Sequence, residues 1–395
     1  MLRKFIEGNE AAAYGVKLSR ANVITAFPIT PQTPLMNKLA EMTASGELKA
    51  KYIRVESEHV SMSVCLGASA AGARPFTASC SQGIAFMTEL IWMASGFRLP
   101  IVMAVVNRSI SCPGSLAAEQ ADSLLQRDTG WIQFYCEDGQ EVLDTIIQAY
   151  KIGEDERLYL PVMVCYDGFT ISHTANTVDI PDQAEVDKFL PPYKHKYIYL
   201  DPDDPREIGV SGPKSGYAFE TRYQMENTIK ASAPVIEKVD SDFRRRFGRS
   251  YDGMVEEYQT DNADALLVTM GSITGTARGV VDKLRAKGKR IGLIKIRAFR
   301  PYPSEELRRI AYGVKTIGVI DRNFSHGSAG GGIGCVEAGR ALINMDEHPK
   351  LLGFVTGLAG RNVTPDHIQY IADRVLKAAE AGKVEREVEW VGLMK

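Results

Sequence analysis

The segment from Tyr52 to Gly83 constrains the fold of this chain more than any other. It begins with a short alternating apolar strand, places carboxylates at Glu56 and Glu58, and continues into a run of small residues at 67–73. A carboxylate at the end of a strand, beside a small-residue helix, occupies the position where an open α/β sheet binds its ligand. An ordinary surface pair of carboxylates has the same spacing, and spacing alone favours that simpler interpretation.

Two further strands are predicted to end at the same edge of this sheet. Residues 23–27 lead into the proline-rich loop 28–34, and the apolar run 99–106 leads into Arg108. Carboxyl ends of parallel strands face one crevice, so Thr30 and Arg108 can converge on one ligand. Arginine can bind a carboxylate through two hydrogen bonds, although a surface position is the commoner one for an arginine. The proline-rich loop also fits a simple connection between a strand and a helix.

The chain divides into two predicted α/β domains. The first covers residues 1–235 and includes an extended arm at 180–216, rich in proline and charge, with little core of its own. A linker at 236–260 follows, and residues 261–395 form the second domain. In that second domain, the glycine-rich stretch 327–334 lacks both the lysine of a phosphate loop and the spacing of a dinucleotide fold, which favours a plain loop.

Composition narrows the function further. The formal charge is −2 over 395 residues, so neither nucleic acid nor an anionic membrane surface is indicated as a partner. The first residues lack a secretory signal, and no apolar run is long enough to span a membrane, so we expect a cytoplasmic protein. The six cysteines form no CxxC pair, and we therefore expect reduced thiols and no metal site in this chain.

Several motifs occur in the order typical of one enzyme family. Together they resemble the α subunit of the 2-oxoacid:ferredoxin oxidoreductases, the pyruvate:ferredoxin oxidoreductase-like family. The resemblance covers nearly the whole chain and rests on residues 9–15, 27–31, 56–59, 67–72, 77–83, 127–133, 296–301 and 321–323.

The resemblance implies a fold and an activity. It implies a doubly wound parallel sheet of the type that binds the pyrimidine side of thiamine diphosphate, followed by an α/β domain like the C-terminal domain of transketolase, which serves assembly. The complete enzyme would oxidatively decarboxylate a 2-oxoacid to acyl-CoA and CO₂, with thiamine diphosphate as the electron sink. A non-catalytic docking subunit, or a nucleotide-binding subunit that uses the loop 327–334, is the alternative.

The resemblance also implies roles for single residues. It gives Glu58 the task of hydrogen-bonding the aminopyrimidine ring, with Glu56 as the second choice. Such an acid must hold its proton and so belongs in a low-dielectric site. Thr30 and Arg108 would bind the carboxyl group of the substrate. The further residues expected to contact the cofactor are Pro28, Ile29, Gln82 and Gly83.

Other parts of the reaction are expected on partner subunits. Thiamine enzymes bind Mg²⁺ and pyrophosphate through a GDG motif, whereas this chain has Asp167-Gly168 without the first glycine, which indicates a turn. We therefore expect the cofactor to be shared with a partner that holds Mg²⁺ and pyrophosphate. The implied partners are β, γ and δ subunits carrying 4Fe–4S clusters, together with ferredoxin or another electron acceptor and coenzyme A.

One segment departs from the pyruvate enzymes. Residues 111–122 keep Pro113 and Asp122, but Gly114, Ser115 and Leu116 replace the pattern of that family. Because this segment borders the substrate pocket in the family, the sequence leaves pyruvate and bulkier branched or aryl 2-oxoacids open as substrates.

Overall fold

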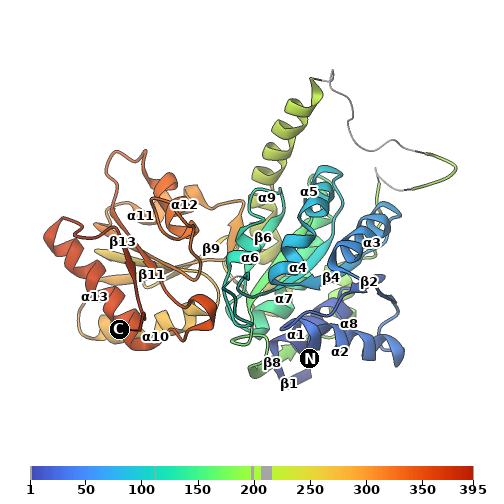
Figure 1. The fold of residues 1–395 in the computed structure, drawn as a ribbon, viewed down its shortest axis with the longest axis horizontal. Coiled ribbons are helices and arrows are strands. Elements are labelled where there is room, and N and C mark those ends of the chain that lie inside the picture. Colours follow the sequence, from blue (N-terminus) through green and yellow to red (C-terminus); the bar gives the residue numbers. More distant parts are fainter. Residues whose placement is uncertain (1, 112, 197–199, 206–215, 395) are drawn as a thin grey trace.

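The computed structural model describes residues 2–111, 113–196, 200–205 and 216–394, which form two large sheets with their helices, side by side, and a small two-stranded sheet (Figure 1). In the first sheet all neighbouring strands are parallel except at β12. The strands across this sheet are β12 (Ala298–Arg300), β6 (Ile132–Tyr135), β7 (Val162–Asp167), β5 (Val102–Asn107), β4 (Pro75–Ser79), β2 (Val23–Ala26) and β3 (Lys51–Arg54).

The order of these strands makes the first sheet doubly wound. From β2 the chain moves to β3 on one side and then crosses back to β4 on the other side of β2. Right-handed crossovers running in opposite directions put their helices on opposite faces of the sheet. The packing agrees with this rule, since α1 (Gly8–Leu18), α2 (Thr33–Ala44) and α7 (Gly139–Gly153) form one contacting group, and α3 (Glu58–Ala70), α4 (Ser81–Phe86) and α5 (Thr88–Gly96) form another.

Helices on both faces bury the central strands completely. Every residue of β4, β5, β6 and β7 is buried. Strands buried on both faces carry continuous apolar runs, and this is why the strand predicted at 99–106 corresponds to β5. The chain after β4 is helical from Ser81 and is interrupted at Met87, giving α4 and α5.

The second sheet is also mostly parallel, with an antiparallel strand β9 at one edge. Its strands, in order, are β15 (Val388–Trp390), β14 (Lys350–Val355), β13 (Thr316–Asp321), β10 (Ala265–Thr269), β11 (Ile291–Ile296) and β9 (Val255–Tyr258). Its helices are α10 (Ile273–Ala286), α11 (Ser304–Ala311), α12 (Ile333–Leu342), the short η1 (Leu358–Gly360) and α13 (Pro365–Ala381).

The start of the expected arm is folded, which corrects the prediction of an extended segment at 180–216. Strand β8 (Ala175–Ile180) pairs with β1 (Leu2–Glu7), and α8 (Gln183–Phe189) follows. Val186, Phe189 and Leu190 are buried, and the ring of Phe189 meets that of Phe243 edge-on at 5.3 Å. These apolar residues recur at helical spacing, a pattern that the density of proline and charge obscured. Residues 197–199 and 206–215 of the arm lie outside the described residues.

Residues 236–260, expected as a linker, are largely regular structure. Helix α9 (Tyr217–Phe247) runs without interruption through 236, and β9 belongs to the second sheet. The first turns of α9 project beyond the rest of the molecule (Figure 1). Strand β12, although it lies among the residues of the second sheet, pairs with β6 of the first.

Buried charges join the two sheets. Lys295 of β11 lies 2.7 Å from Glu141 and 3.1 Å from Glu137, both near the start of α7. Arg297 is fully buried beside Glu141 and donates a hydrogen bond of 3.0 Å to Gln148. Because removing one partner of such a pair leaves an uncompensated buried charge, this cluster fixes how the sheets meet.

Candidate active site

The predicted site residues gather at the carboxyl edge of the first sheet. Thr30 follows β2, Gln82 and Gly83 follow β4, Arg108 follows β5, and Glu58 opens the helix after β3. Strands β2 and β4 are the neighbours at which the winding of the sheet reverses, and open α/β sheets bind ligands at this crevice. The strand-end argument made from the sequence therefore places these residues at one edge.

Glu58 is the buried member of the carboxylate pair. Ser57 caps α3 by accepting a hydrogen bond of 3.2 Å from the amide of Val60, so Glu58 lies in the first turn of the helix. Its exposed fraction is 8 %, whereas Glu56 lies before the cap and is exposed. Within the described residues, the Glu58 carboxylate has neither a hydrogen-bond donor nor a cation as partner.

Gly83 packs directly against Glu58. A Cβ atom at this position would lie 2.7 Å from Oε1 of Glu58 and 2.3 Å from Oγ of Ser79. That Ser79 hydroxyl is also buried without a partner in the described part of the chain. Buried polar groups normally have hydrogen-bond partners, so the unpaired Ser79 hydroxyl, next to the largely buried Glu58, fits a site that receives a polar ligand. The residues present thus fit the aminopyrimidine end of thiamine diphosphate.

The proline-rich loop after β2 is held from three directions. Asn9 of α1 donates a hydrogen bond of 3.0 Å to the carbonyl of Pro31. Gln32 is fully buried and donates 2.8 Å to the carbonyl of Ala78 in β4. The carbonyl of Thr30 accepts from Arg108 at 2.8 Å and from the thiol of Cys80 at 3.2 Å. Pro28 and Thr30 are exposed and Ile29 is half-buried, so the loop is a fixed support that presents its side chains outward.

Arg108 uses part of its hydrogen-bonding capacity to hold the proline-rich loop. One terminal nitrogen of its half-buried guanidinium bonds to Thr30, while its Nε is buried without an acceptor in the described residues. An arginine at this position with unused donors can bind a carboxylate. The sequence placed Thr30 and Arg108 on one ligand, and the structure adds a direct bond between them.

Asp122 is a positioning residue that the sequence did not identify as part of the site. It is fully buried and accepts hydrogen bonds from the amides of Ser81 at 2.8 Å and Arg108 at 3.0 Å. Its other oxygen accepts from the side chain of Asn107 at 2.8 Å. Burial raises the pKa of the Asp122 carboxyl, and these donors act in the opposite direction. One feature of the sequence could have identified Asp122: it matches the family within a segment, 111–122, that otherwise departs from the family pattern.

The turn after β4 is strained and anchored. Ser81 has a φ of 51°, which is unusual for a residue with a side chain. Its amide is held by Asp122, and its hydroxyl lies 2.6 Å from the carbonyl of Ser109. This turn directs the exposed Gln82 and the buried Gly83 into the crevice. Strain of this kind persists only where the surroundings fix it, and it concentrates at functional sites.

Asp167 and the amides that follow the glycine-rich loop 327–334 are both engaged in contacts within the chain. Asp167 ends β7, lies 3.1 Å from Arg322 and accepts a hydrogen bond from the amide of Ser272. At the N-terminus of α12, Asp321 accepts from the amides of Gly334 and Cys335 at 3.0 Å each. A phosphate would need such amides, so the loop gives no support to the alternative of a nucleotide-binding subunit.

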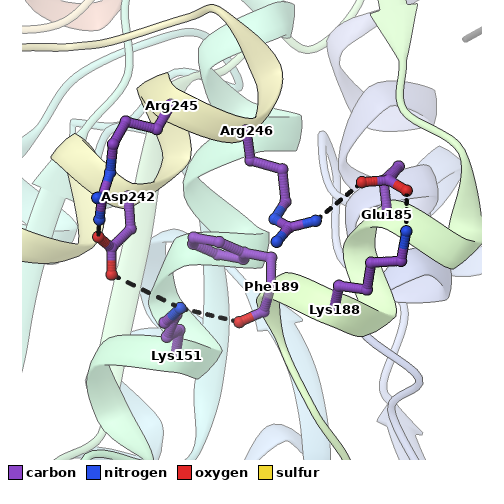
Figure 2. Close-up of a pocket in the computed structure, with 7 residues that line it drawn as sticks. All are labelled: Lys151, Glu185, Lys188, Phe189, Asp242, Arg245 and Arg246. Carbon is purple, nitrogen blue, oxygen red and sulfur yellow. Dashed lines mark hydrogen bonds and ion pairs between the residues drawn. The ribbon is translucent and has the colours of Figure 1, made fainter.

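A separate hollow of about 590 Å³ lies where α7, α8 and α9 meet (Figure 2). Its charged residues pair with one another: Glu185 lies 2.8 Å from Arg246 and 2.6 Å from Lys188, and Arg245 pairs with Asp242. Glu185 and Asp242 thus pair with two of the arginines at the basic end of α9.

The described residues contain neither a metal-binding cluster nor a membrane-spanning helix. No group of three or more histidine, cysteine and acidic residues there could hold a metal ion. Five cysteines are free and buried, and Cys112 lies outside the described residues. None of the described helices has the length and apolarity that crossing a bilayer requires.

Comparison with known proteins places the chain in a family. Residues 14–241 match the family described as "Pyruvate flavodoxin/ferredoxin oxidoreductase, thiamine diP-bdg", and residues 263–368 match "Pyruvate:ferredoxin oxidoreductase core domain II". The chain is 47 % identical to pyruvate synthase subunit PorA of Methanocaldococcus jannaschii, over 99 % of this chain and 98 % of that one. It is 45 % identical to ketoisovalerate oxidoreductase subunit VorA of Pyrococcus furiosus, over 100 % and 99 %.

Solved structures share the fold. The 2-oxoglutarate:ferredoxin oxidoreductase from Magnetococcus marinus superposes with a TM-score of 0.73 at 19 % identity, over 95 % of this chain and 65 % of that one. A split-gene transketolase, described as an inactive beta4 tetramer, gives a TM-score of 0.55 at 14 % identity over 95 % and 99 %. These likenesses confirm the expected fold class, and the identities to PorA and VorA confirm the family: the chain belongs to the α subunits of the 2-oxoacid:ferredoxin oxidoreductases.

Proposed function

We propose that this chain is the α subunit of a thiamine-diphosphate-dependent complex that converts a 2-oxoacid and coenzyme A to acyl-CoA and CO₂ and passes electrons to ferredoxin. The observation that carries the proposal is Glu58, a buried carboxylate without a protein partner, at the switch point of a sheet. Relatives named for pyruvate and for ketoisovalerate are similarly close, so both small and branched 2-oxoacids remain candidate substrates.

Glu58 is the catalytic acid of this proposal. Thiamine diphosphate supplies an electron sink for decarboxylation when it is bound. Glu58 would hydrogen-bond the aminopyrimidine ring and hold a proton at its carboxyl oxygen. Gly83 leaves room for that carboxyl group, because a side chain there would collide with it. Gln82, Pro28 and Ile29 are the further residues proposed to contact the ring.

Thr30 and Arg108 are proposed to bind the carboxyl group of the substrate. The threonine offers a neutral hydroxyl, and the arginine offers a charged donor with unused hydrogen-bonding capacity. Their mutual bond would fix the distance between the two groups before the substrate arrives. Preorganised donors of this kind lose little freedom on binding, which is how positioning assists a reaction.

Partner subunits complete the proposed enzyme. Asp167 is engaged by Ser272 and Arg322, so it is not free for Mg²⁺, and we assign Mg²⁺ and the pyrophosphate to a β-type partner. The 4Fe–4S clusters are assigned to partner subunits of β, γ or δ type. A cytoplasmic location is part of the proposal, and free buried cysteines fit a reducing compartment.

Expression of the chain with and without its partners tests this function. The purified complex should reduce a viologen dye when a 2-oxoacid, coenzyme A, thiamine diphosphate and Mg²⁺ are present, and the chain alone should not. The isolated chain should show no flavin absorbance. A complex that turns over no 2-oxoacid, or a lone chain as active as the complex, would contradict the proposal.

A further inference from the structure

The loop that follows β5, described at residues 109–111 and 113–122, contacts the part of the chain that forms the second sheet. The two ends of this loop border the proposed site directly, since the carbonyl of Ser109 accepts from Ser81 and the amide of Arg108 donates to Asp122. The other side of the loop touches the turn after β14: the amide of Gly360 donates 2.9 Å to the carbonyl of Ala118. The loop therefore lies between the crevice and a turn that is distant in sequence.

Further contacts join the same two regions, residues 117–120 of the loop and the segments after β13 and β14; we call this contact region the seam. The amide of Ala359 donates 3.1 Å to a carboxylate oxygen of Glu119. The amide of Gln120 donates 3.0 Å to the carbonyl of Arg322, which follows β13. The side chain of Arg322 is 5 % exposed and lies 3.1 Å from Asp167 at the end of β7. Main-chain groups that follow β13 and β14 thus hold residues 118–120, and the side chain of Arg322 anchors the same region to β7.

Gly360 and Ala117 are at the closest point of this seam. Gly360 has a φ of +76°, and a Cβ atom there would lie 2.1 Å from the Cβ of Ala117. The carbonyl of Ala117 accepts 3.2 Å from the amide of Ser109. Displacement of Ala117 would thus reach Ser109, whose carbonyl holds the turn that carries Gln82 and Gly83.

We propose that the second sheet takes part in substrate selection: the turn 358–360 and the segment after β13 set the position of residues 113–122, and thereby which 2-oxoacid side chain the site accepts. Gly360 and Glu119 are positioning residues in this proposal and do not touch the reacting atoms. The inference rests on the proposed function and assigns part of its specificity to residues that assembly alone would not require.

Gly360→Ala tests the proposal with a matched control. Gly313 has the same φ of +76°, but a Cβ atom there meets nothing within 4 Å, so Gly313→Ala carries the backbone strain without the collision. In the purified complex, Gly360→Ala should change the ratio of kcat/KM for pyruvate to that for a branched 2-oxoacid by about tenfold, the scale of a one-methylene change in a pocket. Gly313→Ala should leave that ratio within about twofold of wild type.

A second readout does not depend on turnover. Hydrogen exchange of peptides covering 109–122 in the full chain should be faster in Gly360→Ala and unchanged in Gly313→Ala. Adding Ala117→Gly removes the colliding Cβ and should restore both the exchange and the substrate ratio. If Gly360→Ala fails to fold, Glu119→Ala removes one contact of the same seam and should shift the ratio in the same sense.

The outcomes separate the two proposals. A wild-type complex that turns over no 2-oxoacid overturns the proposed function and this inference with it. An active complex in which Gly360→Ala and Glu119→Ala lower all substrates alike, as Gly313→Ala would, overturns the inference alone. Unchanged exchange at 109–122 in Gly360→Ala also overturns it.

Discussion

Arg108 donates a hydrogen bond of 2.8 Å to the main-chain carbonyl of Thr30, joining the carboxyl ends of β5 and β2 across the intervening strand β4. The same carbonyl accepts from the thiol of Cys80 at the end of β4. Three neighbouring strands thus meet at one oxygen atom. The proposed carboxylate-binding pair is therefore assembled before any substrate enters.

Arg108→Ala should lower kcat/KM for every accepted 2-oxoacid by similar factors. Every such substrate carries the carboxyl group, and loss of a charged hydrogen bond costs about 2 kcal/mol, roughly 30-fold in rate. The exposed Arg157, paired with nearby Asp155, offers Arg157→Ala as the control with little effect. Changes at Ser115 or Leu116 should instead alter the ranking among pyruvate, a branched acid and an aryl acid. A ranking altered by Arg108→Ala and indifferent to Ser115 and Leu116 would reverse these roles.

Glu58→Gln should abolish most activity while the complex still assembles. The amide cannot hold the proton that the aminopyrimidine requires, and loss of acid–base assistance typically costs on the order of 10²–10⁴ in rate. Glu56→Gln makes the same chemical change at the exposed member of the pair and should be nearly neutral. Steady-state rates and size-exclusion profiles of both complexes check this. Full activity in Glu58→Gln with loss in Glu56→Gln would move the role by two residues.

Gly83→Ala should reproduce much of the Glu58→Gln defect without changing any charge. The new Cβ would lie 2.7 Å from Oε1 of Glu58, so the carboxyl group must move. Gly67→Ala, in the middle of α3, meets nothing within 4 Å and should keep activity. Alanine also has the higher helix propensity, so that control should be as stable as wild type or more so. Equal activity of the two variants would show that Gly83 does not shape the site.

The stability contributed by Asp321 should fall as the pH rises. Burial raises the pKa of this carboxyl to about 6 from an unfolded value of 3.8, so the folded state binds the proton more tightly. The contribution is then present below about pH 4 and is lost as the pH rises through about 6, by roughly 3 kcal/mol. Denaturant unfolding of wild type and Asp321→Asn should give a difference in unfolding free energy that declines over this window. A difference independent of pH would contradict the raised pKa.

The sequence by itself determined the fold class and brought the candidate site residues to one edge of the first sheet. Apolar runs such as 99–106 specify buried parallel strands because their residues must avoid water on both faces. The residues that follow those runs then share one edge, which is why the sequence alone predicts that Thr30 and Arg108 lie together. The motif at 321–323 also corresponds to residues with structural contacts. Asp321 holds the start of α12, and Arg322 forms an ion pair with Asp167 of the other sheet.

Only the tertiary structure showed that Glu58 is buried while Glu56 is exposed, and only it revealed the contacts of Asp122. The two glutamates have the same chemistry and lie two residues apart. Their burial depends on the cap at Ser57 and on the packing of Gly83, from a different strand end. Asp122 meets Ser81 over 41 residues of sequence, and Glu119 meets Ala359 over 240. Local patterns report the period of a strand or helix, whereas contacts of this range exist only once separate elements have packed together, and this is why the sequence could not specify them.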